Sequence, residues 1–201
     1  MAMQAVERAR ELGDDAPGGP VVLNGVTWER YEALLALLGD GQPALRMTYR
    51  EGTLEIMTTS PYHERLKKMI ARLLEMWAVE RNVPLTGYGA ATFRKQAMER
   101  GLEPDECYVL GELVDVPDIA IEVVYKHVID KLDVYAGLGV PEVWIWADGA
   151  LVVHRLVGSG YQISERSMLL PGLDLAELAS FVQRDLSQTE VVRAYRDGLR
   201  R

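Results

Sequence analysis

One apolar segment, residues 118–125, constrains the fold of this 201-residue chain most strongly, because it carries a carboxylate in its middle. Successive side chains of a β-strand point to opposite faces, so one face of this segment is wholly apolar. That face consists of Ile119, Ile121, Val123 and Tyr125. Asp118 and Glu122 share the other face, and a carboxylate at Glu122 is costly to bury unless it is paired or binds a metal ion. Either this second face is exposed to solvent, or Glu122 belongs to a polar site inside the protein.

Helical and strand patterns alternate around this segment. Residues 62–81 carry an apolar stripe at helical spacing, and residues 128–138 form a shorter helical pattern that ends at Gly139. Further helices are predicted from Trp28 to Gly39, at 174–181 and at 190–199, and further strands at 44–49, 53–57, 88–96, 107–110, 142–147, 151–156 and 161–164. This order predicts an α/β fold: a mixed β-sheet flanked by helices, with additional β-hairpins. We expect strands 88–96, 107–110 and 118–125 to be neighbours.

The chain has the length of one domain. Residues 1–20 are polar and end in the loop sequence Ala16-Pro17-Gly18-Gly19-Pro20, which predicts an N-terminal helix or arm ahead of a single domain at 21–201. The N-terminus lacks a signal peptide, and no apolar run approaches the roughly 18 residues of a membrane span. Cys107 is the single cysteine, so no internal disulfide can form. These features indicate a cytoplasmic protein without a membrane partner.

Asp105 offers a second carboxylate for the site. It follows Pro104 at the start of the predicted strand that precedes residues 118–125. Neighbouring strands lie roughly 4.8 Å apart, so Asp105 and Glu122 could meet across a strand pair. Two such carboxylates form an all-oxygen site for a hard ion, Mg²⁺ or Mn²⁺, with Asp118 as a further candidate ligand. Clustered carboxylates repel each other, so we expect at least one raised pKa in the metal-free protein.

Lys131 lies just beyond the carboxylate-bearing strand, within the predicted helix 128–138. From the shoulder of that helix it could reach back toward Glu122 and stabilise a water or a developing negative charge. The alternative is a surface lysine whose stem covers apolar side chains.

Together these residues resemble a known nuclease family. Pro104-Asp105 followed by Glu122 is similar to the PD-(D/E)xK signature. The stretch that runs through Pro117-Asp118-Ile119-Ala120-Ile121-Glu122 and Lys131 to Gly139-Val140-Pro141-Glu142-Val143-Trp144 resembles the Uma-type family of putative restriction endonucleases, over roughly residues 40–180. The resemblance implies a restriction-endonuclease-like core and a Mg²⁺- or Mn²⁺-dependent endonuclease. Its substrate would be nucleic acid, DNA first, and cutting a duplex favours a homodimer with two active sites.

One position departs from the standard signature. The signature lysine stands two residues after the acid, where this chain has Val124. The resemblance assigns its role to Lys131, with Lys126 as the runner-up, although Lys126 lies about 13 Å from Glu122 along an extended strand. Glu64 resembles the helix acid that some of these nucleases add, whereas the pattern alone marks it as part of a helix start.

The charge of the chain favours a different interpretation. The net charge is −8, while phosphate binding usually requires a basic surface. Two short basic clusters are present, and such clusters are more typical of a solvated helix face: Arg65, Lys67, Lys68 and Arg72, then Arg94 and Lys95. The alternative function is therefore a non-catalytic interaction or regulatory module that retains the nuclease fold.

Overall fold

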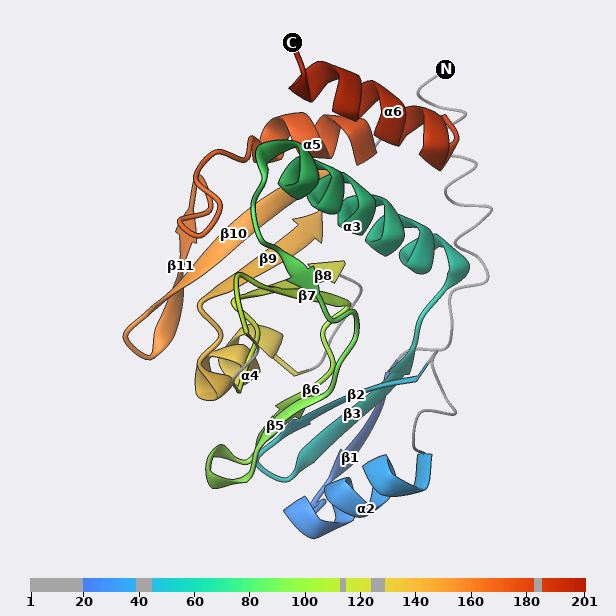
Figure 1. The fold of residues 1–201 in the computed structure, drawn as a ribbon. Helices are drawn as coiled ribbons and strands as arrows, with labels where there is room; N and C mark the ends of the chain where they lie inside the picture. Colours follow the sequence, from blue (N-terminus) through green and yellow to red (C-terminus); the bar gives the residue numbers. More distant parts are fainter. Residues whose placement is uncertain (1–19, 39–44, 113–114, 124–128, 183–185) are drawn as a thin grey trace.

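The structure is a computed structural model that describes residues 20–38, 45–112, 115–123, 129–182 and 186–201. Within these ranges the chain forms two β-sheets and the helices that cover them (Figure 1). The helix or arm expected at residues 1–20 lies, apart from Pro20, outside the described residues.

The first sheet has five strands in the order β1-β3-β2-β6-β5, all antiparallel. Their bounds are β1 Val21–Asn24, β2 Leu45–Arg50, β3 Thr53–Thr58, β5 Phe93–Lys95 and β6 Arg100–Leu102. The turn between β2 and β3 places Glu51 and Gly52 at positive φ, 42° and 84°, as a two-residue hairpin requires. Helix α2 (Trp28–Leu38) buries Tyr31 against this sheet, where its ring stacks on Tyr49.

The second sheet has six strands in the order β11-β10-β9-β8-β7-β4. Their bounds are β4 Thr86–Gly87, β7 Glu106–Val109, β8 Ile119–Val123, β9 Glu142–Ala147, β10 Ala150–Val157 and β11 Gly160–Ser164. Strands β8 and β9 are parallel and every other pair is antiparallel, so this is the mixed sheet expected from the sequence. Strand β8 lies between β7 and β9, and all five of its residues are buried.

Helices cover both faces of the second sheet. On one face, α3 (Pro61–Arg81), α5 (Leu175–Val182) and α6 (Gln188–Leu199) bury the large apolar cluster that includes Ile119, Ile121 and Val123. On the other face, α4 (Lys131–Leu138) packs over Ala120, and its cluster also contains Phe93 and Leu102 of the first sheet. Helix α4 therefore lies between the two sheets (Figure 1).

Two N-caps fix where the site-bearing helices begin. Ser60 caps α3 by accepting a hydrogen bond from the backbone N–H of His63, and Pro61 suits the first helical turn. Asp130 caps α4 through the backbone N–H of Leu132 at 3.0 Å. His63 and Lys131 are thus both held in the first turn of a capped helix.

The predicted strand at 88–96 is wrong. Gly89 takes a positive φ of 59°, which interrupts an extended chain, and only Phe93–Lys95 is a strand. That strand belongs to the first sheet, where it pairs with β6, an element that the sequence pattern did not reveal. The pairing expected between strands 107–110 and 118–125 is confirmed, with Cys107 opposite Ala120.

No helix in the described part of the chain has the length and apolar character needed to cross a membrane.

Candidate active site

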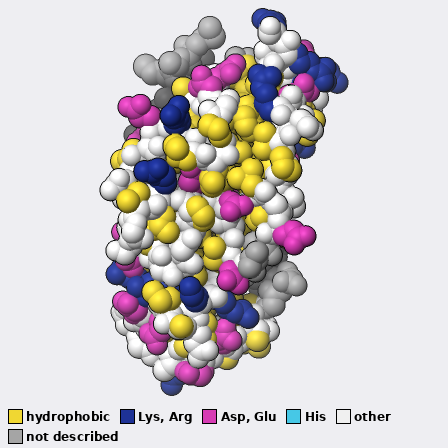
Figure 2. Space-filling model, turned by 60° about the vertical axis from the view of Figure 1, so that its left-hand side comes forward, with side chains coloured by type: hydrophobic (Ala, Val, Ile, Leu, Met, Phe, Trp, Pro, Cys, Tyr) yellow, Lys and Arg dark blue, Asp and Glu magenta, His cyan; other side chains and the backbone are white. Residues whose placement is uncertain are grey.

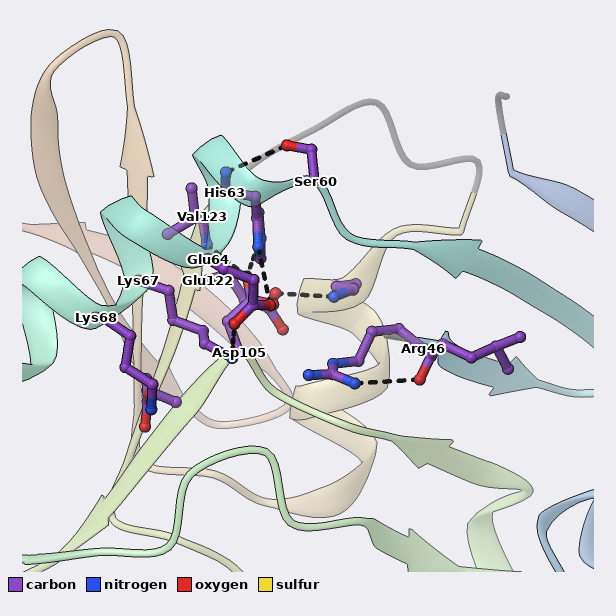
Figure 3. A network of polar contacts seen from close by, with 12 residues as sticks. Arg46, Ser60, His63, Glu64, Lys67, Lys68, Asp105, Glu122 and Val123 are labelled. Atoms are coloured by element: carbon purple, nitrogen blue, oxygen red, sulfur yellow. Dashed lines mark hydrogen bonds and ion pairs between the residues drawn. The ribbon is translucent and has the colours of Figure 1, made fainter. Parts of the chain in front are cut away.

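Asp105 directly precedes β7 and is only 4% exposed. Its Oδ2 accepts a hydrogen bond from the backbone N–H of Val123 at 2.8 Å. The same oxygen lies 2.9 Å from Nε2 of His63, on the first turn of α3 (Figure 3). An ionised carboxylate can only accept, so Nε2 carries the shared proton. Asp105 is therefore clamped between α3 and the end of β8.

Glu122, in β8, is 3% exposed, so its face of the strand is not open to solvent. Its Oε2 lies 2.8 Å from Nζ of Lys131, and its Oε1 accepts a hydrogen bond from the hydroxyl of Tyr135. Both partners come from α4, one turn apart. The side chain of Lys131 is 11% exposed, which excludes the surface-lysine alternative.

The charges of these groups are tightly linked. Burial raises the pKa of Glu122 to about 7, and the negative charge of Asp105 acts in the same direction, although Lys131 opposes both. Burial would also raise the pKa of Asp105, but the hydrogen bond from His63 and the charge of Lys131 outweigh it and lower that pKa to about 2. The two carboxylates raise the pKa of Lys131 despite its burial. Groups with such opposed shifts are typical of functional sites.

Glu64 occupies the rim of this cluster rather than its centre. Its side chain is 38% exposed, and its Oε2 pairs with the buried Lys67 at 2.8 Å. Its Oε1 lies 3.7 Å from Nδ1 of His63. Within the described residues no hydrogen bond or ion pair joins Glu64 to Asp105 or Glu122, and the ring of His63 lies between Glu64 and Asp105.

Asp118 is not brought to the other carboxylates. It shares the face of Glu122 on the same chain segment but precedes it by four residues, about 13 Å of extended strand. Its Oδ2 instead accepts a hydrogen bond from the backbone N–H of Leu110 at 2.7 Å, which ties together the connection between β7 and β8. Lys126 and Val124 lie outside the described residues.

Two residues of the cluster were not foreseen as site residues. The contact of His63 with Asp105 joins residues 42 positions apart. Glu55, in β3, is 1% exposed, and its Oε2 accepts a hydrogen bond from the backbone N–H of Ile129 at 3.1 Å, 74 positions away. Its charge helps to raise the pKa of Lys131. Neither contact has a local sequence signal.

The donor set of the centre fits a hard divalent ion. Asp105 and Glu122 supply buried carboxylate oxygens, and Mg²⁺ is commonly held by one or two carboxylates with water completing its shell. Across the described ranges, no group of three or more His, Cys, Asp and Glu side chains is arranged to hold a metal ion. The protein would thus offer two carboxylate ligands, and water or substrate would fill the remaining coordination positions of the ion.

Figure 3 shows Arg46 extending toward the same cluster, so further positive charge lies beside it.

A family model and one solved structure show which known proteins this chain is similar to. Residues 28–189 match the model of the Uma2 family, described as "Putative restriction endonuclease". One solved structure, of a putative nuclease belonging to DUF820 from Anabaena variabilis ATCC 29413, aligns at 12% sequence identity with a TM-score of 0.44. The alignment covers 74% of this chain and 90% of that one. No curated protein matches the chain.

Proposed function

Since this chain belongs to the Uma2 family, we propose that it is a metal-dependent endonuclease that hydrolyses phosphodiester bonds in nucleic acid, with DNA as the first substrate to test. Asp105 and Glu122 would hold a Mg²⁺ or Mn²⁺ ion, and Lys131 would serve as the lysine of the site. The alternative assignment of that role to Lys126 is tested alongside it below.

One observation supports this proposal: two acids and a lysine from three separate segments of the chain, Asp105, Glu122 and Lys131, lie in one buried cluster. The Nζ of Lys131 lies 2.8 Å from Glu122, and its charge also lowers the pKa of Asp105. Burying two carboxylates and a lysine costs free energy that apolar residues would not. Such a cost is expected where the charges serve a function.

Each residue of the cluster would have its own role in phosphodiester hydrolysis. A bound divalent ion would polarise the phosphate and lower the pKa of the attacking water. Lys131 would donate a hydrogen bond to that water or to a phosphate oxygen and stabilise the negative charge that develops there. Tyr135 would hold Glu122 in place through its hydroxyl. The side chains of the cluster are buried, so each of these interactions would act in a lower dielectric than water, where it is stronger.

The proposal is tested by nicking of supercoiled plasmid DNA in Mg²⁺ or Mn²⁺. We expect Asp105→Asn, Glu122→Gln and Lys131→Met each to slow nicking by at least 10²-fold, the order that loss of one charge-stabilising group costs. Lys95→Met is the matched control, because Lys95 is an exposed lysine of β5 and should keep wild-type activity. Lys126→Met separates the two candidate lysines.

Lys131→Met also leaves Glu122 buried without its cation, so the folded fraction of each variant is measured first by circular dichroism. If folded Lys131→Met cuts as fast as wild type while Lys126→Met does not, the lysine is misassigned. If wild-type protein cuts neither DNA nor RNA with either metal, the non-catalytic interaction module becomes the better account of this fold.

A further inference from the structure

His63 is a buried titratable residue to which the nuclease signature gives no role. It is 3% exposed, and Ser60 fixes its backbone at the start of α3 by accepting from its N–H at 3.2 Å. Its ring lies with Nε2 at 2.9 Å from Oδ2 of Asp105 and with Nδ1 at 3.7 Å from Glu64. The imidazole therefore stands between two carboxylates, and its backbone is anchored independently of both.

The hydrogen bonds of Asp105 use only one of its two oxygens. Both His63 Nε2 and the backbone N–H of Val123 meet Oδ2, and in the part of the chain that the structure describes no hydrogen bond reaches Oδ1. Val123 directly follows Glu122, so the bond from Val123 sets the position of one carboxylate relative to the other. The bond from His63 restrains the remaining freedom, the rotation of the carboxyl group about its own side-chain bonds.

We propose that His63 is a positioning residue that orients Asp105 for the divalent ion. By holding Oδ2 against α3, it leaves Oδ1 directed away from the helix and available as a ligand. Partners of this kind behind a metal-binding carboxylate typically change metal affinity by 10–100-fold. This inference rests on the proposed function, because it assumes that Asp105 binds the ion.

The test measures Mn²⁺ binding directly by isothermal titration calorimetry, without DNA. His63→Ala is expected to weaken Mn²⁺ binding by 10–100-fold. His63→Gln, whose amide nitrogen can donate from nearly the position of Nε2, is expected to recover most of that loss. His154→Ala is the matched control: His154 lies in β10, paired with β9 and β11, and its loss should leave the affinity unchanged.

A purely structural role would give a different pattern. Urea unfolding in the presence of a chelator reports the stability of each variant without metal, and a structural His63 would lower that stability while leaving the Mn²⁺ affinity of the folded fraction intact. Equal Mn²⁺ affinity in wild type and folded His63→Ala overturns the inference and leaves the proposed function standing. Absence of Mn²⁺ binding by wild type overturns both, so the two failures are distinguishable.

Discussion

Glu122 is subject to opposing influences on its charge. Burial and Asp105 favour the protonated acid, whereas Lys131 and the hydroxyl of Tyr135 favour the carboxylate. The result is a pKa of about 7, where a divalent ion that displaces a proton can bind at neutral pH without a large penalty. The neighbouring Asp105 remains ionised far below neutrality. The pair thus combines one permanent negative charge with one that can be neutralised.

The raised pKa predicts a pH dependence of stability in the metal-free protein. Between the ordinary pKa of 4.5 and the folded value of about 7, folded Glu122 keeps a proton that the unfolded chain has lost. Its contribution to the free energy of unfolding is therefore complete below pH 4.5 and falls as pH rises to about 7, by a total on the order of 3 kcal/mol. Urea unfolding in chelator at intervals across this range should show the fall in wild type and a smaller one in Glu122→Gln. Identical pH profiles for the two proteins would mean that Glu122 titrates normally.

At the scale of elements, the Gly-Val-Pro-Glu-x-Trp block that ends α4 and begins β9 serves the fold. Glu142 is 1% exposed and accepts from Trp144 Nε1 at 2.9 Å, Ser167 Oγ at 2.7 Å and the backbone N–H of Met168 at 2.7 Å. These bonds fasten the segment after β11 to β9. Glu142 therefore has a structural role. Its hydrogen-bond donors in the described part of the chain are uncharged, whereas Glu122 pairs with Lys131.

Glu142→Ala should therefore destabilise the protein without acting on the proposed metal site. It leaves Trp144 and Ser167 without their shared acceptor, so the free energy of unfolding should fall on the order of 3 kcal/mol. Glu165→Ala is the control, because Glu165 is exposed, and it should change the free energy of unfolding by less than about 0.5 kcal/mol. The measurement is urea unfolding followed by circular dichroism. A stable Glu142→Ala protein with impaired Mn²⁺ binding would instead place Glu142 in the functional site.

Local patterns predicted those parts of the molecule that depend on neighbours in sequence. Alternation identified β8 and the face that Glu122 occupies, and helical spacing identified α3 and α4 to within a few residues. The same alternation put Asp118 on that face, but a shared face does not bring together side chains four residues apart on a strand. Strand β5 was misplaced because its partner, β6, is a three-residue element that no pattern reveals.

The contacts of His63 and Glu55 with the site could not be predicted for a related reason. Each depends on how one sheet or helix packs against another: α3 against the end of β8, and β3 of the first sheet against the chain that leads into α4. Periodicity shows which face of an element is buried and says nothing about its partner. In the sequence, polar residues that make such contacts cannot be distinguished from those that cap helices or form turns.

At the scale of the whole molecule, the net charge of −8 remains the main argument against nucleic acid binding. On the face drawn in Figure 2, acidic and basic side chains are interspersed, and the basic ones do not merge into one broad patch. The basic cluster of α3 divides in the structure: Lys67 is buried against Glu64, while Arg65, Lys68 and Arg72 are exposed on the helix whose first turn holds His63. Of these three, Lys68 pairs with Glu106 of β7 at 3.0 Å.

If the protein binds DNA along this helix, Arg65 and Arg72 contact phosphates. Replacing both by alanine in a Glu122→Gln background should weaken binding of a duplex and flatten the slope of log affinity against log salt by roughly 0.9 for each lost contact. Fluorescence anisotropy over a range of salt concentrations measures both quantities. Arg155→Ala, an exposed arginine of β10, is the control. An unchanged slope would identify the α3 cluster as a solvated helix face.

If Asp105 and Glu122 bind one divalent ion between them, an anomalous difference map from crystals soaked in Mn²⁺ should reveal it. We expect a single strong peak within roughly 2.0–2.6 Å of an oxygen of each carboxylate. We also expect Lys131 to move away from Glu122 or to redirect its ammonium to a bound water. A fully occupied peak elsewhere, or no peak at Mn²⁺ concentrations that support cleavage, would rule out a metal ion shared by the two carboxylates.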